Sequence, residues 1–152
     1  MKNKNGHLSP IVAFFMILLL LPLSGCEKAP FNSDIEGFWR LDKFVTHADG
    51  VTVMPDGLFF SIQLWLVQVS DKQGSSNVQS FTGRYAFDET TNTVKMWDFS
   101  MVGLSGEPLY ATVEQLAPYG IGALETVFDV VEAGGGHLVL RSEYSTLYLS
   151  RF

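Results

Sequence analysis

The chain is poor in positive charge, in histidine and in cysteine. Ten Lys and Arg residues stand against sixteen Asp and Glu residues, and the formal net charge is −6 at pH 7. Because nucleic-acid binding needs a basic face that neutralises phosphates, we expect no nucleic-acid partner. Cys26 is the only cysteine, so no disulfide can form within the chain. At 152 residues the chain is long enough for one domain with one core, and too short for two of typical size.

The chain also lacks the local patterns of common catalytic and metal sites. His47 and His137 each stand without a second His, Cys or carboxylate at ligand spacing. The segment 103–107 misses the second glycine of a nucleophile elbow by one position, and the glycines 134–136 lack the lysine and helix of a phosphate loop. The carboxylates are dispersed, although an acid–base pair that forms only in the fold stays open. We therefore predict no metal, no cofactor and no enzymatic activity.

No apolar run in the sequence is long enough to cross a bilayer as a helix. The segment Ile11–Leu23 is apolar over about 13 residues, whereas a spanning helix needs ~20. A basic start with Lys2, Lys4 and His7 precedes it. A basic start followed by a short apolar run is typical of a secretory signal peptide. We predict a cleaved signal peptide over residues 1–25 rather than an anchor helix.

Small residues and the lone cysteine follow the apolar run. Leu23-Ser24-Gly25-Cys26 resembles the lipobox of bacterial lipoproteins, in which the peptide before the cysteine is removed and the cysteine is acylated. The resemblance implies a lipid on Cys26; an ordinary cleaved signal with an incidental cysteine is the alternative. Several acyl chains, at ~0.8 kcal/mol per buried methylene, give lasting membrane attachment. Because Glu27 rather than Asp follows the cysteine, the resemblance also favours the outer membrane of the cell envelope, on either face.

Beyond the cysteine, short β-rich segments alternate with turn signals. Residues 26–34 lack periodicity and are interpreted as a spacer. Strands are expected over residues 38–46, 58–69, 81–87, 93–100, 124–132, 137–142 and 146–152, with a short one over 51–54. Thr112 and Gln115 have the spacing of a capping box, and Pro118 and Gly120 follow. This pattern predicts one short helix before the last three strands.

The strand expected over 58–69 is the longest, and one of its faces is apolar throughout. The residues predicted to point inward are Leu58, Phe60, Ile62, Leu64 and Leu66. All-β chains with strands at this spacing form sandwiches or barrels, and closure removes the exposed sheet edges. We predict an all-β domain over residues 35–152, an antiparallel up-and-down β-barrel of about eight strands.

The two ends of this domain carry a family resemblance. Gly37-Phe38-Trp39 on the first strand looks like the Gly-x-Trp signature of lipocalins and the wider calycin group, and Arg151 on the last strand is the matching arginine. The whole arrangement resembles small bacterial lipocalin-like lipoproteins. The resemblance implies that Trp39 plugs one barrel end and that Arg151 packs across it, with Gly37, Trp39 and Arg151 in a structural role rather than as ligand contacts.

Two functions of different classes follow from this interpretation. The first is non-catalytic binding of a small apolar molecule inside the barrel. Its candidate wall residues are Phe60, Leu64, Tyr85 and Phe128. The second is a packed barrel that serves as an interaction or accessory module of a cell-envelope assembly, through loops or exposed aromatics such as Trp65 and Trp97. A barrel of eight strands has the size at which the lumen is either filled or able to hold one small ligand.

Overall fold

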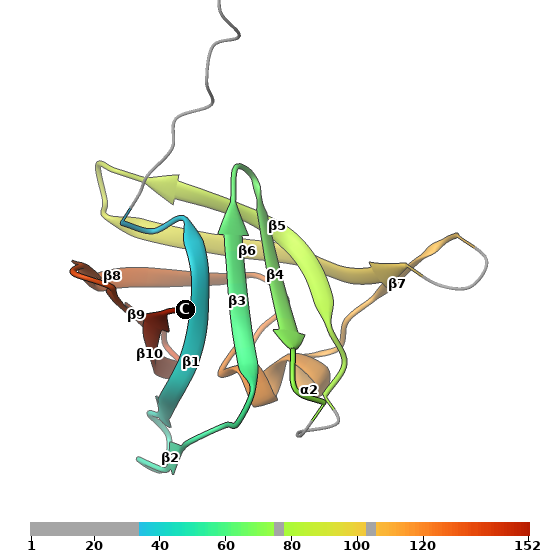
Figure 1. Ribbon diagram of the computed structural model, residues 1–152, viewed down its shortest axis with the longest axis horizontal. Coiled ribbons are helices and arrows are strands. Elements are labelled where there is room, and N and C mark those ends of the chain that lie inside the picture. The colour runs from blue at the N-terminus through green and yellow to red at the C-terminus, as the bar shows by residue number, and fades with distance from the viewer. Residues whose placement is uncertain (1–33, 75–77, 103–105) are drawn as a thin grey trace, which may run out of the picture.

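The computed structural model describes residues 34–74, 78–102 and 106–152, which form a β-barrel (Figure 1). The barrel strands are β1 (Gly37–Thr46), β3 (Leu58–Gln63), β4 (Leu66–Asp71), β5 (Phe81–Asp88), β6 (Thr93–Val102), β8 (Thr126–Gly134), β9 (His137–Arg141) and β10 (Ser145–Arg151). Each is antiparallel to its neighbours, and β10 pairs with β1 to close the ring. The predicted up-and-down barrel of eight strands is confirmed.

Two short strands lie beside the ring. β2 (Thr52–Val53) pairs with β1, and β7 (Pro108–Tyr110) pairs with β6. The segment 51–54 was among the expected strands, whereas β7 was not, because three residues are too few to show an alternation. The proposed signal peptide, Cys26 and the spacer up to residue 33 lie outside the described residues, as do residues 103–105 of the 103–107 segment. Within the described ranges, no helix is long and apolar enough to cross a membrane.

The prediction of one long strand over residues 58–69 is wrong, because these residues form a hairpin. Residues 58–69 divide into β3 and β4, joined by the two-residue turn Leu64–Trp65, with Gln63 paired to Leu66. Leu64 has a φ of 59°, in the left-handed region that costs a residue with a side chain roughly 1–2 kcal/mol. Turns of this kind usually carry Gly, Asn or Asp, so an unbroken apolar alternation hides this one.

The alternation of inward and outward residues in β6 reverses within the strand. Val94 and Met96 point into the core, while Asp98 adopts a φ of 56°, and beyond this irregularity Phe99 is the buried residue. The register with β5 shifts at the same level, and a Cβ on Gly83 would lie 2.8 Å from Cδ1 of Phe99. The glycine therefore makes room for the Phe99 ring. Because a bulge reverses the alternation, the sequence of this strand does not show by itself which of its faces points inward.

The predicted helix is present and is followed by a tighter turn. α2 (Val113–Leu116) begins at Thr112, whose hydroxyl accepts from the Gln115 N–H, while the Gln115 side chain accepts from the Thr112 N–H. The 3₁₀ helix η1 (Ala117–Tyr119) continues it and ends at Gly120, which has a φ of 74°. The capping box is thus confirmed. Figure 1 shows α2 at the opposite end of the barrel from the β3–β4 turn.

Candidate functional site

Trp39 occupies the barrel end at which β1 begins. Its side chain is fully buried, and its indole Nε1 donates a hydrogen bond to the carbonyl oxygen of Ile35 at 2.8 Å. Arg151 on β10 is its register partner, and the guanidinium carbon lies 4.5 Å from the centroid of the indole ring. A guanidinium over an aromatic face is worth about 0.5–2 kcal/mol, depending on how far it is desolvated. The structure thus joins the last strand to the first across this end.

Gly37 is adjacent to the same pair. It has a φ of 154°, and a Cβ there would lie 2.6 Å from Nη1 of Arg151. The other guanidinium nitrogen, Nη2, donates to the carbonyl oxygen of Glu36 at 3.3 Å. The three residues that the sequence assigned to the barrel end therefore lie in one cluster. The absence of a side chain at Gly37 is what lets the guanidinium approach the backbone.

The opposite barrel end is filled by the segment 116–121, which we call the plug. Leu116, Tyr119 and Ile121 are all fully buried. The Tyr119 hydroxyl donates to the carbonyl oxygen of Gln79 at 3.0 Å, and Oγ of Ser145 donates to the carbonyl oxygen of Gly120 at 2.6 Å. Burial, assisted by the negative charge of Asp71, raises the pKa of Tyr119. The plug is therefore held by its apolar side chains and by hydrogen bonds to both flanking parts of the barrel.

A continuous column of aromatic side chains joins the two ends. Trp39 on β1 pairs in register with Phe60 on β3, and the Phe60 ring packs edge-on against Tyr119 with 6.2 Å between centroids. Phe128 on β8 is part of the same buried cluster. Trp39, Phe60, Tyr119 and Phe128 have no solvent-accessible surface, so no water-sized space borders them. The lumen is filled with side chains along this column.

The candidate wall residues divide between the inside and the outside of the barrel. Phe60, Tyr85 and Phe128 lie inside, in one core cluster. Leu64 does not: it lies in the β3–β4 turn with 48% of its surface exposed, so its assignment to the wall was wrong. The two-residue turn ends the alternation one position before it. Burial, together with the nearby charge of Glu36, raises the pKa of Tyr85 to about 12. Tyr85 is therefore a protonated phenol at neutral pH.

The sequence predicted neither the plug nor the β3–β4 turn. For the plug, the one local signal was Leu116 as an apolar residue inside a capped turn. Its insertion into the barrel depends on contacts with Gln79 and Ser145, which are remote in sequence. For the turn there was no local signal, because Leu64 and Leu66 continue the inward alternation of the strand expected over 58–69 and none of the usual turn residues is present.

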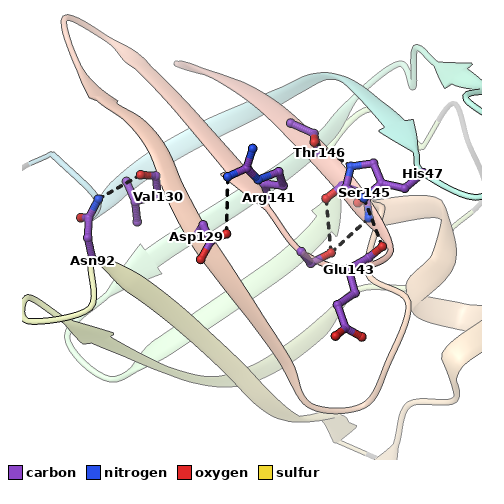
Figure 2. Close-up of polar contacts among 9 residues, drawn as sticks. His47, Asn92, Asp129, Val130, Arg141, Glu143, Ser145 and Thr146 are labelled. Carbon is purple, nitrogen blue, oxygen red and sulfur yellow. Dashed lines mark hydrogen bonds and ion pairs between the residues drawn. The ribbon is translucent and has the colours of Figure 1, made fainter.

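Polar contacts fix His47 at the barrel end that holds the plug. Its Nδ1 lies 3.1 Å from the carbonyl oxygen of Glu143, and its Nε2 lies 2.9 Å from Oγ1 of Thr146 (Figure 2). The backbone N–H of His47 also donates to the carbonyl oxygen of Tyr144 at 2.9 Å. The two ring nitrogens thus tie the end of β1 to the β9–β10 connection, through Glu143, and to the start of β10, through Thr146. No group of three or more His, Cys, Asp or Glu side chains in the described ranges could hold a metal ion.

A groove of about 560 Å3 lies on the outer wall, over β4, β5 and β6. Its lining includes Leu66, Thr82 and Ser100. The exposed ion pair between Nε of Arg84 and Oδ2 of Asp98, 3.5 Å apart, lies in it. The groove is open to solvent and separate from the lumen. Beside it, β7 exposes 54% of Leu109 and 68% of Tyr110.

Residues 19–152 match the family described as lipocalin-like domain. The chain belongs to the lipocalin-like domain family. The resemblance inferred from Gly37, Trp39 and Arg151 is thereby confirmed at the level of the family.

Solved structures give the same fold. A lipocalin-like protein from Bacteroides uniformis ATCC 8492 is 19% identical, with a TM-score of 0.57, over 78% of this chain and 99% of its own. An uncharacterized protein from Bacteroides eggerthii DSM 20697 is also 19% identical, with a TM-score of 0.55, over 77% of this chain and 98% of its own. Comparison with curated proteins finds no match. At this identity the two structures support the barrel of this lipocalin-like chain and nothing about its ligands.

Proposed function

We propose that this lipocalin-like protein is a lipoprotein of the outer membrane, held there by acyl chains on Cys26. Residues 1–25 are its cleaved signal peptide, residues 26–34 its tether and residues 35–152 its barrel. The support is the lipobox-like Leu23–Cys26, its place directly after a short apolar run, and the absence of a second cysteine that could pair with Cys26. The barrel is therefore a domain tethered to a membrane by lipid.

We further propose that the barrel acts without catalysis, through its outer surface, as an interaction module of the cell envelope. The observation that carries this is the filled lumen: the column from Trp39 through Phe60 to Tyr119 leaves no room for a guest. Four ion pairs among the described residues lie on the exposed outer surface of the barrel, away from the lumen. They are Arg40–Asp42, Arg84–Asp98, Lys95–Glu125 and Arg141–Asp129.

The face of the barrel that fits a protein partner best is the groove with β7 beside it. β7 pairs with β6, and all three of its residues are exposed. Strands with a free edge bind extended segments of other proteins by adding a strand to the sheet. The exposed side chains of Leu109 and Tyr110 would supply apolar contact there. Trp97 contributes less to such a surface, because it is half-buried with Nζ of Lys95 5.4 Å from the centroid of its ring.

A second candidate function is the binding of a small apolar molecule in the lumen. It is favoured by the aromatic inner wall, with Phe60, Tyr85 and Phe128, and by the small size of the plug. For a ligand to enter, Tyr119 would have to leave the barrel, which breaks its hydrogen bond to the carbonyl oxygen of Gln79. Binding would then cost the free energy of opening that end.

Native mass spectrometry separates the two functions. The acylated protein is purified gently from its own host's envelope, and its mass is compared with that of the Tyr119→Ala variant, in which the plug lacks its ring. If the lumen is filled, the wild type should carry no adduct and should show no thermal shift with a panel of small apolar molecules. Tyr119→Ala should bind such molecules, because the loss of the ring leaves an empty apolar cavity. A stoichiometric apolar adduct on the wild type would instead establish a carrier.

A further inference from the structure

Three adjacent large apolar side chains are exposed at the β3–β4 turn. Leu64, Trp65 and Leu66, which we call the apolar turn, are 48%, 62% and 53% exposed. A run of exposed apolar residues on a soluble domain marks a surface that contacts something other than water. We propose that the apolar turn inserts into the lipid interface beside the acylated Cys26 and orients the barrel on the membrane. This inference rests on the lipid anchoring proposed above.

The apolar turn lies at the barrel end from which the tether leaves. The backbone N–H of Leu64 donates to Oε2 of the buried Glu36 at 3.3 Å, and Glu36 immediately precedes β1. Figure 1 shows the β3–β4 turn and the start of β1 at the same end. The first described residue, Asp34, is two positions from Glu36. A lipid on Cys26 therefore draws this end of the barrel towards the bilayer by the most direct path.

The length of the tether limits which surfaces can reach the membrane. About eight residues separate Cys26 from Asp34, and a fully extended chain spans at most ~3.6 Å per residue, or about 29 Å. The ten residues of β1 alone span about 33 Å at ~3.3 Å per residue. The exposed Met54 near the other end would reach lipid only if the tether ran back along the barrel. The apolar turn needs no such path.

The backbone of the turn gives a second, independent indication. Leu64 has a φ of 59°, a conformation that glycine adopts freely and leucine does not. The fold gains little from the side chain, which is half exposed and outside the core. A leucine here is therefore unfavourable for the barrel in water. Burial of the same side chain among lipid acyl chains supplies the apolar contact that the barrel does not.

The chemistry of this end fits an uncharged lipid surface. Tryptophan prefers the membrane–water interface, where its apolar ring and its N–H group are both satisfied. The exposed Asp88 ends β5 at the same end and the exposed Glu89 follows it, and the chain is acidic, so anionic headgroups would repel it. Arg84 beside the turn is paired with Asp98. The attraction is therefore apolar, and the surface it suits is zwitterionic phospholipid.

Quenching of tryptophan fluorescence by brominated lipid tests the insertion. The full acylated protein is reconstituted in vesicles of phosphatidylcholine and phosphatidylethanolamine with brominated acyl chains. We expect quenching that is lost in Trp65→Phe and kept in Trp97→Phe, because Trp39 is buried in the barrel. Replacing part of the lipid with phosphatidylglycerol should not increase the quenching.

A pair of glycine variants separates insertion from folding. Leu64→Gly suits the backbone of the turn and should keep or raise the melting temperature, yet it should lose most of the Trp65 quenching. Met54→Gly removes an apolar side chain that is 76% exposed near the other barrel end, and it should leave the quenching unchanged.

Each alternative outcome has its own signature. Protein that carries the acyl mass and floats with vesicles, but whose Trp65 is not quenched, would overturn the insertion and leave the lipid anchoring intact. Shielding of Trp65 from a water-soluble quencher only when envelope proteins are added, again without quenching by lipid, would overturn it in favour of a protein partner. Absence of both the acyl mass on Cys26 and flotation would refute the anchoring and the insertion together.

Discussion

The guanidinium carbon of Arg151 lies 4.5 Å from the centroid of the Trp39 ring, although the two residues are 112 positions apart in the sequence. The contact joins the last barrel strand to the first at the end where the tether leaves. It also covers the buried indole, whose Nε1 is bonded to the carbonyl oxygen of Ile35. Stability at this end therefore depends on the ring, on the cation and on the glycine that gives the cation room.

Replacement of Trp39 by alanine should destabilise the barrel by about 3–5 kcal/mol, because it empties a fully buried site. The free energy of unfolding in urea measures the loss. Trp65→Ala is the matched control, since it removes the same side chain from an exposed turn and should cost less than about 0.5 kcal/mol in water. A loss below about 1 kcal/mol for Trp39→Ala would show that this end does not depend on the ring.

Gly37→Ala should be destabilising for two reasons: its φ of 154° strains a residue with a side chain, and its Cβ would meet Nη1 of Arg151, which would have to leave its place over Trp39. The cost should therefore be smaller when the guanidinium is absent. A double-mutant cycle with Arg151→Ala, followed by urea unfolding, should give a coupling of about 1–2 kcal/mol. Additive effects of the two substitutions would contradict a contact between Cβ at position 37 and Arg151. Backbone strain at Gly37 would then be the only cause of the destabilisation.

The stability of the barrel should fall at alkaline pH as the buried phenols ionise. The pKa of Tyr85 is raised to about 12 from the model-peptide value of 10.0, so above pH 10 the unfolded chain loses this proton first. Stability is complete below that pH and decreases as the pH rises through the folded pKa. Unfolding free energies measured across this range should decline less steeply in Tyr85→Phe. An equal slope in the variant would show that Tyr85 is not the group responsible.

His47→Ala should cost about 1–2 kcal/mol, because it removes the contacts of its ring nitrogens with Glu143 in the β9–β10 connection and with Thr146 in β10. His137→Ala is the control, since that side chain is exposed at the start of β9 and should matter by less than about 0.5 kcal/mol. Urea unfolding compares the two. Equal losses would indicate that the bonds of His47 add nothing beyond the removal of an imidazole.

Cys26→Ser should prevent acylation and move the protein from the membrane fraction to the soluble fraction. The change of a single sulfur to oxygen leaves the barrel residues untouched, so any shift of location reports the lipid alone. Metabolic labelling with a fatty acid and fractionation provide the measurement. Persistent membrane association of the variant, with no label on the wild type, would contradict the proposed anchor.

Local features were the part of this structure that the sequence determined. The capping box of Thr112 and Gln115 lies within one turn, and the strands that alternate without interruption, such as β5 and β10, follow from a period of two that neighbouring residues alone create. The Gly-x-Trp motif and Arg151 identified the family because their types and places are legible without a structure. The lipobox-like sequence is local in the same sense, and it is the basis of the proposed attachment to the membrane.

Only the tertiary structure decided where the alternation breaks. The turn at Leu64 carries none of the usual turn residues, and Glu36, 28 positions earlier, accepts the N–H that the turn presents. The bulge at Asp98 is matched by Gly83 on the neighbouring strand. Both depend on partners that a local pattern does not contain, which is why Leu64 was assigned to the wall.

The state of the lumen was likewise decided by the tertiary structure. The sequence predicts a barrel of eight strands, and at this size the lumen is either filled with side chains or able to hold one small ligand. Whether the lumen is filled depends on the summed volume of the side chains from all strands and on the plug. Tyr119 of the plug packs against Phe60, although it comes from the connection between β7 and β8 and not from a barrel strand. Strand identity is a property of neighbours along the chain, whereas packing is a property of neighbours in space.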